Sequence, residues 1–174
     1  HTLKGHVERP PVPGVTYSPD GKLLASASWD NNVIIWDAET GTELHKLGPG
    51  YRGAKYTPYN SVVFSPDGKE LCACSGNKTI TTWSVADGKQ INQWEAHDQT
   101  IYAVAYSRDG SRIASTGADG RIRLWSSKTG AIELEAVGHR DVVRSLAFGA
   151  EDRTLVSAGA DQRIKRWAIK DQSP

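Results

Sequence analysis

The chain has 174 residues, 38% of them hydrophobic, and its 21 basic residues nearly balance 20 acidic ones, leaving a formal net charge of +1. Binding to nucleic acid through phosphate contacts requires a basic surface, so we expect no nucleic-acid partner. No apolar run is long enough to span a bilayer and no secretory segment is present, so we expect no membrane partner. The chain contains no methionine, so we expect that sequence upstream of it is missing.

Short apolar runs alternate with tight-turn sequences from the N-terminus onward. The first run, Val15–Tyr17, is followed by Ser-Pro-Asp-Gly at 18–21, and a second run, Leu23–Ser28, precedes a third, Val33–Trp36. The Ser-Pro-Asp-Gly sequence suits a type I turn whose glycine takes the left-handed position of a hairpin bulge. This order of run, turn and run predicts antiparallel strands.

The same order of runs recurs three more times along the chain. The later runs are Val62–Phe64, Leu71–Ser75, Thr79–Trp83, Ile101–Tyr106, Ile113–Thr116, Ile122–Trp125, Leu155–Ala158 and Ile164–Trp167. In the first three repeats, a turn containing glycine after the third run leads to a fourth, outer run. Short strands at regular spacing, without helical periodicity, predict an all-β fold with a four-stranded antiparallel sheet in each repeat.

A histidine, a serine, an aspartate and a tryptophan recur together at nearly constant spacing in three of the four repeats. The three sets are His6, Ser26, Asp30 and Trp36; His97, Ser115, Asp119 and Trp125; and His139, Ser157, Asp161 and Trp167. Tryptophan only donates hydrogen bonds, ionised aspartate only accepts them, and serine and histidine do both. A chain from tryptophan to serine to histidine to aspartate therefore satisfies every group when buried. We call each set a polar clamp and predict that its role is structural.

These sets resemble the WD-repeat β-propeller family, and the resemblance covers nearly the whole chain. Trp36-Asp37 is the dipeptide that names the family, and Gly5-His6 and Gly138-His139 match the Gly-His that opens a repeat. The tryptophans of successive repeats are 47, 42 and 42 residues apart, a period typical of such arrays. The resemblance implies sheets arranged radially as the blades of a β-propeller.

We expect one propeller unit of four blades. The predicted parts are a fourth strand at 1–4, blade 1 at 5–47, blade 2 at 48–94, blade 3 at 95–137 and blade 4, with three strands, at 138–174. The strand at 1–4 would complete the last blade of this chain or of a neighbouring one. An open arc of four blades would expose apolar faces, so we expect a homodimer that closes an eight-bladed ring. The alternatives are a fragment of a longer propeller and a four-bladed monomer.

The second repeat lacks the polar clamp. Gly50, Ala73 and Asn77 stand where the other repeats have histidine, serine and aspartate, and the entry loop at 48–58 is about five residues longer than in the next two repeats. Two interpretations stay open: a drifted repeat with a flexible loop, or an inserted recognition loop. The candidate recognition residues of that loop are Tyr51, Arg52, Lys55 and Tyr56.

The resemblance implies a non-catalytic scaffold that presents a loop-bearing propeller face to a protein or peptide partner. By position, the candidate partner-binding residues are Trp29, Asn60, Thr100, Tyr102, Val142 and Arg144, together with Tyr51 and Arg52 of the long loop. Trp29 stands where the other repeats have glycine or alanine, so it is unlike a repeated core residue. We expect it to be either a binding hot spot or a cover for the loop Glu8–Pro13.

A self-assembling structural oligomer and a hydrolase that uses the central channel are the alternative functions. A catalytic triad needs one exposed serine beside an oxyanion hole, whereas these serines recur inside strands, so we expect no enzyme. No cofactor is expected, and no cysteine and histidine cluster has the spacing of a zinc site. Cys72 and Cys74 lie two residues apart without a disulfide framework, which favours a reducing compartment and a cytoplasmic location.

Overall fold

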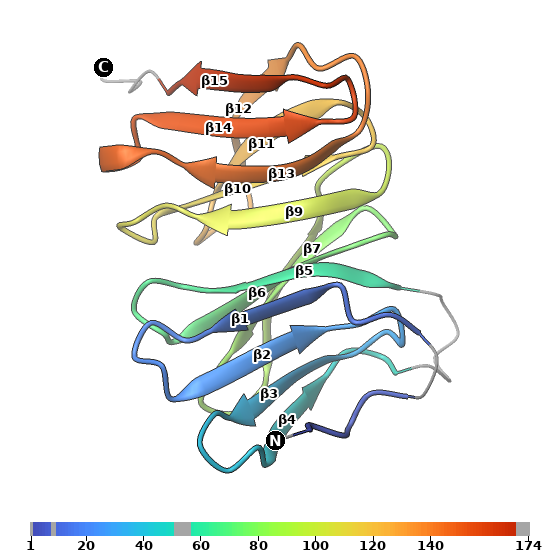
Figure 1. Ribbon diagram of the computed structural model, residues 1–174. Helices are drawn as coiled ribbons and strands as arrows, with labels where there is room; N and C mark the ends of the chain where they lie inside the picture. The colour runs from blue at the N-terminus through green and yellow to red at the C-terminus, as the bar shows by residue number, and fades with distance from the viewer. Residues whose placement is uncertain (1, 8–9, 51–56, 170–174) are drawn as a thin grey trace.

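The structure is a computed structural model that describes residues 2–7, 10–50 and 57–169 (Figure 1). The first sheet contains β1 (Gly14–Tyr17), β2 (Leu23–Ala27), β3 (Val33–Asp37) and β4 (Glu43–Leu47). The second contains β5 (Tyr59–Phe64), β6 (Glu70–Ser75), β7 (Thr79–Ser84) and β8 (Gln90–Glu95). The third contains β9 (Ile101–Tyr106), β10 (Arg112–Gly117), β11 (Arg121–Ser126) and β12 (Ile132–Val137). The fourth contains β13 (Val143–Phe148), β14 (Thr154–Gly159) and β15 (Ile164–Ala168), with the 3₁₀ turn η1 (Ala150–Asp152) between β13 and β14.

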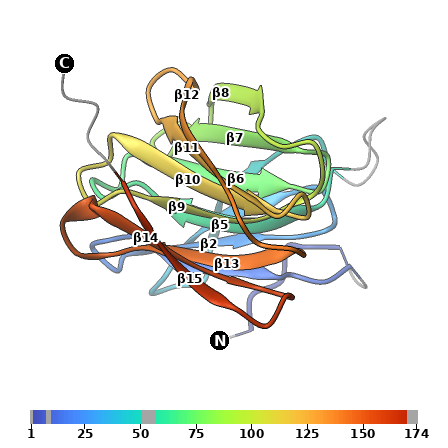
Figure 2. The ribbon, with the colours of Figure 1, turned by 90° about the horizontal axis from the view of Figure 1, so that it is seen from above.

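Within each sheet, every strand pairs antiparallel with the strand that follows it in the chain. The predicted all-β architecture of four antiparallel sheets, each a propeller blade, is thereby confirmed. The first strands of consecutive sheets contact one another, β1 with β5, β5 with β9 and β9 with β13. Figure 2 shows the second and third sheets extending outward from β5 and β9 to β8 and β12.

The turn between β1 and β2 illustrates why the strands are short. The backbone N–H of Gly21 donates to the carbonyl of Ser18 at 2.9 Å, and Gly21 has a φ of 73°, a conformation that other residues rarely adopt. The Ser18 hydroxyl donates to the Asp20 carboxylate at 2.6 Å and accepts from the N–H of Leu23 at 2.9 Å. These bonds end one strand and begin the next within a few residues. In the fourth sheet, η1 takes the place of this turn.

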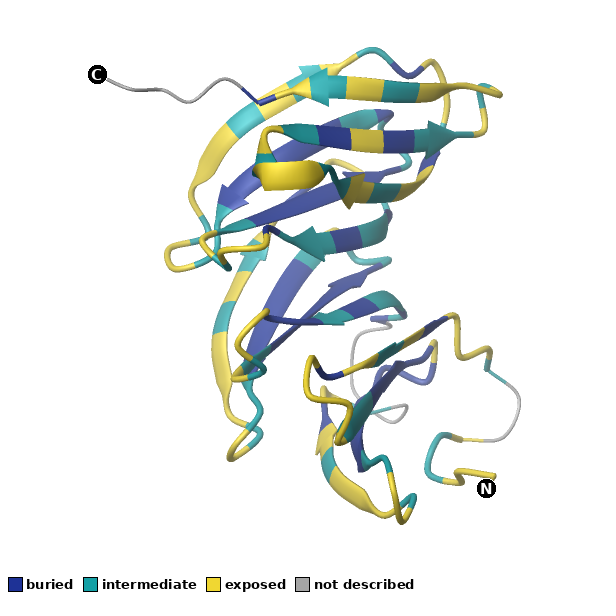
Figure 3. Ribbon diagram, turned by 60° about the vertical axis from the view of Figure 1, so that its left-hand side comes forward, coloured by how far each residue is buried: buried dark blue, intermediate teal, exposed yellow. Residues whose placement is uncertain are grey.

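The hydrophobic cores lie between neighbouring blades. In the first core, Ala25, Val33 and Leu47 of blade 1 share a cluster with Val62 and Trp83 of blade 2. Two further clusters join blade 2 to blade 3 and blade 3 to blade 4. Figure 3 shows the same arrangement, with buried residues on strands between blades and exposed residues on the outer strands. Each blade is therefore stabilised by its neighbours, as in other repeat proteins.

Residues 2–4, predicted to be a fourth strand, form no strand in this chain. They do not complete the last blade of their own chain, because the first and last sheets lie at opposite ends of the arc (Figure 1). Leu3 lies instead beside Gly41, in the turn between β3 and β4. Whether this segment completes the blade of a neighbouring chain stays a prediction.

Candidate functional site

The polar clamps have the predicted geometry. In blade 3, the Trp125 indole N–H donates to the Ser115 hydroxyl at 2.8 Å, and that hydroxyl lies 2.8 Å from Nε2 of His97. Nδ1 of His97 lies 2.8 Å from the Asp119 carboxylate. The corresponding three distances are 2.9, 2.7 and 3.0 Å in blade 1 and 2.8, 2.7 and 2.9 Å in blade 4. Because the indole can only donate and the carboxylate can only accept, the serine hydroxyl donates to Nε2 and Nδ1–H donates to the aspartate.

The clamp carboxylates are held in their ionised form. Burial alone would raise the pKa of Asp119, but the hydrogen bond from His97 and the charge of Arg123 lower the pKa below its ordinary value. At Asp30, burial is likewise outweighed by hydrogen bonds from the N–H of Val7 and from His6, so its pKa is lowered too. The clamp serines, buried inside strands and engaged on both sides, serve as links in a structural network.

Blade 2 keeps its tryptophan in place differently. With Ala73 at the serine position, no partner for the Trp83 indole N–H is found within the described part of the chain. Instead the ring of Tyr59, only 2% exposed, meets Trp83 edge-on at 5.8 Å between centroids. In blade 1, the ring of His6 lies at a similar 6.3 Å from Trp36. Tyr59 therefore supplies the aromatic contact that the missing histidine would have made, and sequence reasoning missed this residue.

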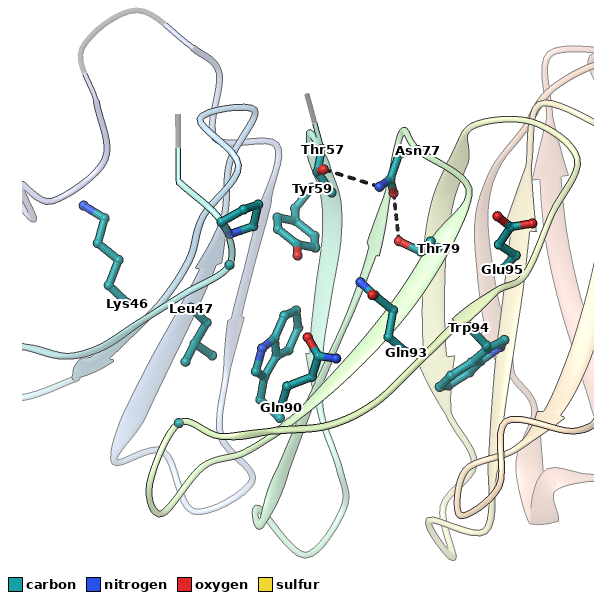
Figure 4. A pocket seen from close by; sticks show the side chains of 14 residues that line it. Lys46, Leu47, Thr57, Tyr59, Asn77, Thr79, Gln90, Gln93, Trp94 and Glu95 are labelled. Atoms are coloured by element: carbon teal, nitrogen blue, oxygen red, sulfur yellow. Dashed lines mark hydrogen bonds between the residues drawn. The ribbon is translucent and has the colours of Figure 1, made fainter. Parts of the chain in front are cut away.

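A cavity of about 710 Å³ opens beside Trp83, between blades 1 and 2. Figure 4 shows Lys46 and Leu47 of β4 on one side of it and Gln93 and Glu95 of β8 on the other. The lining also includes Asn77, which stands at the position of the clamp aspartate: its Nδ2 donates to Thr57 at 3.3 Å and its Oδ1 accepts from Thr79 at 2.8 Å. The only sequence signal for this hollow was the missing clamp. The predicted recognition residues Tyr51 and Arg52, with Lys55 and Tyr56, lie outside the described residues.

A second cavity, of about 330 Å³, lies where the sequence predicted a partner-binding face. Its lining consists of Trp29, Pro58, Asn60, Gly76, Thr100 and Tyr102. The structure thus brings together four of the predicted residues from loops and strands of three blades. We call this the Trp29 cavity.

Hydrogen bonds across blades fix the wall of the Trp29 cavity. The Trp29 indole N–H donates to Oδ1 of Asn60 at 2.8 Å, and Nδ2 of Asn60 donates to the carbonyl of Ile101 at 2.7 Å. Trp29 contacts the N-terminal loop through its backbone, whose N–H donates to the carbonyl of Pro11 at 3.1 Å. Its ring is therefore turned toward blade 2 and remains 38% exposed.

Two other predicted residues differ in their placement. The Arg144 guanidinium of blade 4 lies over the ring of Tyr102 of blade 3, 5.1 Å from its centroid, in a cation–π contact. No ion pair joins Arg144 to a carboxylate of the described residues. Val142 is half-buried and does not line the cavity. Its backbone carbonyl instead accepts from the N–H of Ala160 at 2.7 Å.

Other kinds of site find little support in the described ranges. No three histidine, cysteine, aspartate or glutamate side chains there are grouped so that they could hold a metal ion. No helix among these residues is long and apolar enough to cross a membrane. Cys72 and Cys74 are free and fully buried, and burial raises the pKa of both thiols, which keeps them protonated and unreactive.

Radially arranged antiparallel blades, three of them tied by tryptophan, serine, histidine and aspartate, define a β-propeller of the WD-repeat class. Residues 1–37, 50–84, 88–126 and 132–168 match the sequence profile of the WD40 family, described as WD domain, G-beta repeat. These stretches make up most of the chain, so the chain belongs to the WD40 repeat family.

One curated protein resembles part of the chain in sequence, and two solved structures resemble nearly all of it in fold. It is 49% identical to Protein Mut11 of Chlamydomonas reinhardtii over 45 residues, which are 26% of this chain and 12% of Mut11. The structure of U3-55K superposes with a TM-score of 0.86 at 25% identity, over 98% of this chain and 52% of U3-55K. The computationally designed Ika4 protein superposes with a TM-score of 0.80 at 25% identity, over 97% of this chain and 96% of Ika4. The chain thus spans about half of the U3-55K chain and nearly all of the Ika4 chain.

Proposed function

We propose that this chain is a non-catalytic scaffold that binds a protein or peptide partner at the Trp29 cavity. The observation that carries this proposal is the convergence of Trp29, Asn60, Thr100 and Tyr102 on one cavity of about 330 Å³. Exposed aromatic side chains next to an arginine are the composition of binding hot spots. The bonds from Trp29 to Asn60 and from Asn60 to blade 3 hold the cavity wall before a partner arrives, which lowers the entropy cost of binding.

The chemistry of the cavity indicates what the partner presents. The space between Trp29 and Tyr102 suits an apolar side chain, because both walls are aromatic. Arg144 is positioned over Tyr102 without a carboxylate partner among the described residues, so it is available to a carboxylate of the partner. A peptide that carries an apolar residue close to an acidic one fits both features.

The test is selection of peptides from a random displayed library on the wild-type chain, followed by affinity measurements on variants. We expect the selected peptides to pair an apolar residue with Asp or Glu. Trp29→Ala and Tyr102→Ala should each weaken binding at least tenfold, which corresponds to about 1.4 kcal/mol. Arg144→Gln should weaken acidic peptides more than neutral ones.

The matched control is Ile91→Ala, an exposed apolar residue on the outer strand β8 and outside the cavity lining. This variant should bind the selected peptides as the wild type does, and all variants should melt near the wild-type temperature. Peptides that bind Trp29→Ala and Tyr102→Ala with wild-type affinity would place recognition elsewhere and refute the proposal.

Two further properties belong to the proposal. We propose that the working form is a homodimer that completes an eight-bladed ring, supported by the uncovered apolar faces of the end blades. We also propose a cytoplasmic location, because Cys72 and Cys74 are free thiols on one strand. Fractionation of cells expressing the parent protein tests the location, and recovery from an oxidising compartment would contradict it.

A further inference from the structure

The first blade exposes a face that the next two blades bury. Val15 on β1 is 71% exposed, whereas Val62 and Val104, at the same register positions of β5 and β9, are 3% and 4% exposed. Tyr17 is 62% exposed, whereas its counterpart Phe64 is 7% exposed. Val62 and Phe64 are covered by the preceding blade, and blade 1 has no preceding blade in this chain.

The last blade exposes the complementary face. Ile164 on β15 is 79% exposed, whereas Val33, Ile80 and Ile122, at the same position of the third strand in blades 1 to 3, are fully buried. Val156 on β14 is also exposed, although its counterparts in the other blades are buried. In the other blades this face is covered by the blade that follows.

The exposed faces of the first and last blades match the two surfaces that form each core between neighbouring blades. We call them the ring-closing faces. We define the first by Val15 and Tyr17 and the second by Val156, Ala158 and Ile164. Inside the chain, surfaces of these two kinds pack together in each of the three clusters between blades. One copy cannot bring its own ring-closing faces together, because they lie at opposite ends of the arc (Figures 1 and 3).

The placement of Leu3 is a second, independent observation. A Cβ added at Gly130, in the outer turn of blade 3, would lie 3.0 Å from Trp94, which is on the fourth strand of the preceding blade. A Cβ added at Gly41, in the same turn of blade 1, would lie 2.7 Å from Leu3. Leu3 therefore occupies, beside blade 1, the place that the fourth strand of a preceding blade occupies beside blade 3.

The strand register identifies what Leu3 would pair with. Trp94 lies three residues before His97, as Leu3 lies three residues before His6. Trp94 pairs across the strands with Ile80, whose counterpart in blade 4 is Ile164. Leu3 is therefore placed to cover the residue equivalent to Ile164 in a blade like blade 4. That blade would belong to a second copy of the chain.

We infer that two copies of this chain close an eight-bladed ring in which blade 4 of each copy packs on blade 1 of the other. Residues 2–4 of each copy then provide the fourth strand beside β15 of the other. This inference rests on the homodimer proposed above and deepens it by naming the interface. Ring closure forms this contact at two places, so both ring-closing faces of each copy are buried. It thereby removes the apolar surface that soluble proteins avoid exposing.

Closure also has a consequence for recognition. The two-fold axis of such a dimer coincides with the axis of the ring, so both Trp29 cavities open on the same face. A partner with two copies of the binding segment, or a partner that is itself dimeric, can then occupy both cavities. Such bivalent binding raises the apparent affinity by about 100-fold or more without any new contact.

The first test is the mass in solution, by light scattering coupled to size exclusion, over a dilution series. We expect the wild-type chain to have twice the monomer mass of 18.9 kDa. Ile164→Asp should give a monomer, because the charge would be buried in the closed ring. The side chain is 79% exposed in a single copy, so the variant should keep its fold by circular dichroism. Ile91→Asp, an equally drastic change on the outer strand β8, should leave the dimer intact.

The second test uses complementary charges. Val15→Glu and Ile164→Lys should each be monomeric alone, because each disrupts both contacts of the ring. When the two variants are mixed, one contact pairs glutamate with lysine and the other is wild type, so a dimer should re-form. A wild-type chain that is monomeric, or larger than a dimer, overturns the inference, as does a mixture that stays monomeric. A monomer that still binds the selected peptides at Trp29 would refute the ring and leave the scaffold function standing.

Discussion

Blades 2 and 3 have the same strand order but hold their third strand in different ways. In blade 3, a buried chain of hydrogen bonds runs from Trp125 through Ser115 and His97 to Asp119. In blade 2, the ring of Tyr59 packs edge-on against Trp83. Blade 2 of this chain therefore forms without the polar clamp, with an aromatic ring packed against its tryptophan. Four predictions break or sharpen this comparison.

The largest effect is expected at Tyr59, because blade 2 has no clamp to support it. Tyr59→Ala removes a ring that is 2% exposed and leaves a cavity against Trp83, so the free energy of unfolding should fall by about 3–5 kcal/mol. Tyr59→Phe keeps the ring and loses only the hydroxyl bonded to Thr81, so it should cost about 1 kcal/mol. Urea unfolding at fixed protein concentration measures both, and near-equal losses would mean that the ring contact is not what supports the blade.

A smaller loss is expected when the clamp of blade 3 is broken. His97→Leu leaves the Ser115 hydroxyl and the Asp119 carboxylate without their shared partner, which should reduce stability by about 2 kcal/mol. The carboxylate retains Arg123 at 3.4 Å, so the loss should stay below that of Tyr59→Ala. His45→Leu is the control: this histidine is half-buried on β4, outside any clamp, and its loss should change stability by less than about 0.5 kcal/mol. Equal effects at both histidines would show that the network contributes nothing.

Acid should weaken the polar clamps. The pKa of Asp30, Asp119 and Asp161 is lowered from the ordinary value of 3.8 in the folded chain. A carboxyl group with a lowered folded pKa contributes stability that is fully present above its unfolded pKa and is lost as pH falls through the folded value. The wild-type chain should therefore lose stability below about pH 4.

The clamp's share of this acid sensitivity is measurable with Asp119→Asn, which keeps the acceptor oxygen for His97 and removes the titrating group. Its unfolding free energy should fall less steeply than that of the wild type as pH is lowered from about 4 to about 2 in urea titrations. Asp67→Asn gives the comparison, because it removes a turn carboxylate outside the clamps whose pKa is also lowered. A wild-type slope in Asp119→Asn would show that the clamp carboxylate does not drive the acid response.

Most of the fold could be predicted from the sequence because its signals are local and repeated. The Ser-Pro-Asp-Gly turn fixes where β1 and β2 meet, through bonds between residues 18 and 23. The clamps were predictable because donors and acceptors at constant spacing leave one complete pairing. Four residues that line the Trp29 cavity could be predicted because equivalent positions recur in each blade. The hydrogen bond from Trp29 to Asn60 could not, because it joins two blades and the spacing of the repeats does not indicate it.

The role of Tyr59 and the fate of the N-terminal segment could not be predicted in the same way. Tyr59 is one aromatic residue in an apolar run. Its contact with Trp83 depends on the orientation of the two side-chain rings, which tertiary packing sets. Strand-like alignment of residues 1–4 carried no information on which blade they would join, because a fourth strand needs a third strand at its side. Packing between blades decides the contact of Tyr59 and the position of the N-terminal segment, and the sequence of a single repeat does not specify that packing.

The smallest effect is expected when the missing clamp is added to blade 2. The triple variant Gly50→His, Ala73→Ser and Asn77→Asp restores the sequence pattern, but Gly50 has a φ of 74°, which strains a histidine there. Tyr59 already lies against Trp83, so a new imidazole would compete for that space. Replacing the Asn77 amide by a carboxylate would remove the N–H donor that now bonds the Thr57 hydroxyl. We expect a change in stability of less than about 1 kcal/mol in urea unfolding.

A control separates the strain at position 50 from the value of the clamp itself. The double variant Ala73→Ser and Asn77→Asp keeps Gly50, so any difference between it and the triple variant measures the histidine in its strained conformation. If the triple variant gained about 2 kcal/mol or more, as a complete clamp would supply on an unstrained backbone, Tyr59 would not be a substitute for the missing histidine. The expected near-neutral result would mean instead that blade 2 has reached a different packing solution, in which an aromatic ring and an adjacent hollow replace three polar side chains.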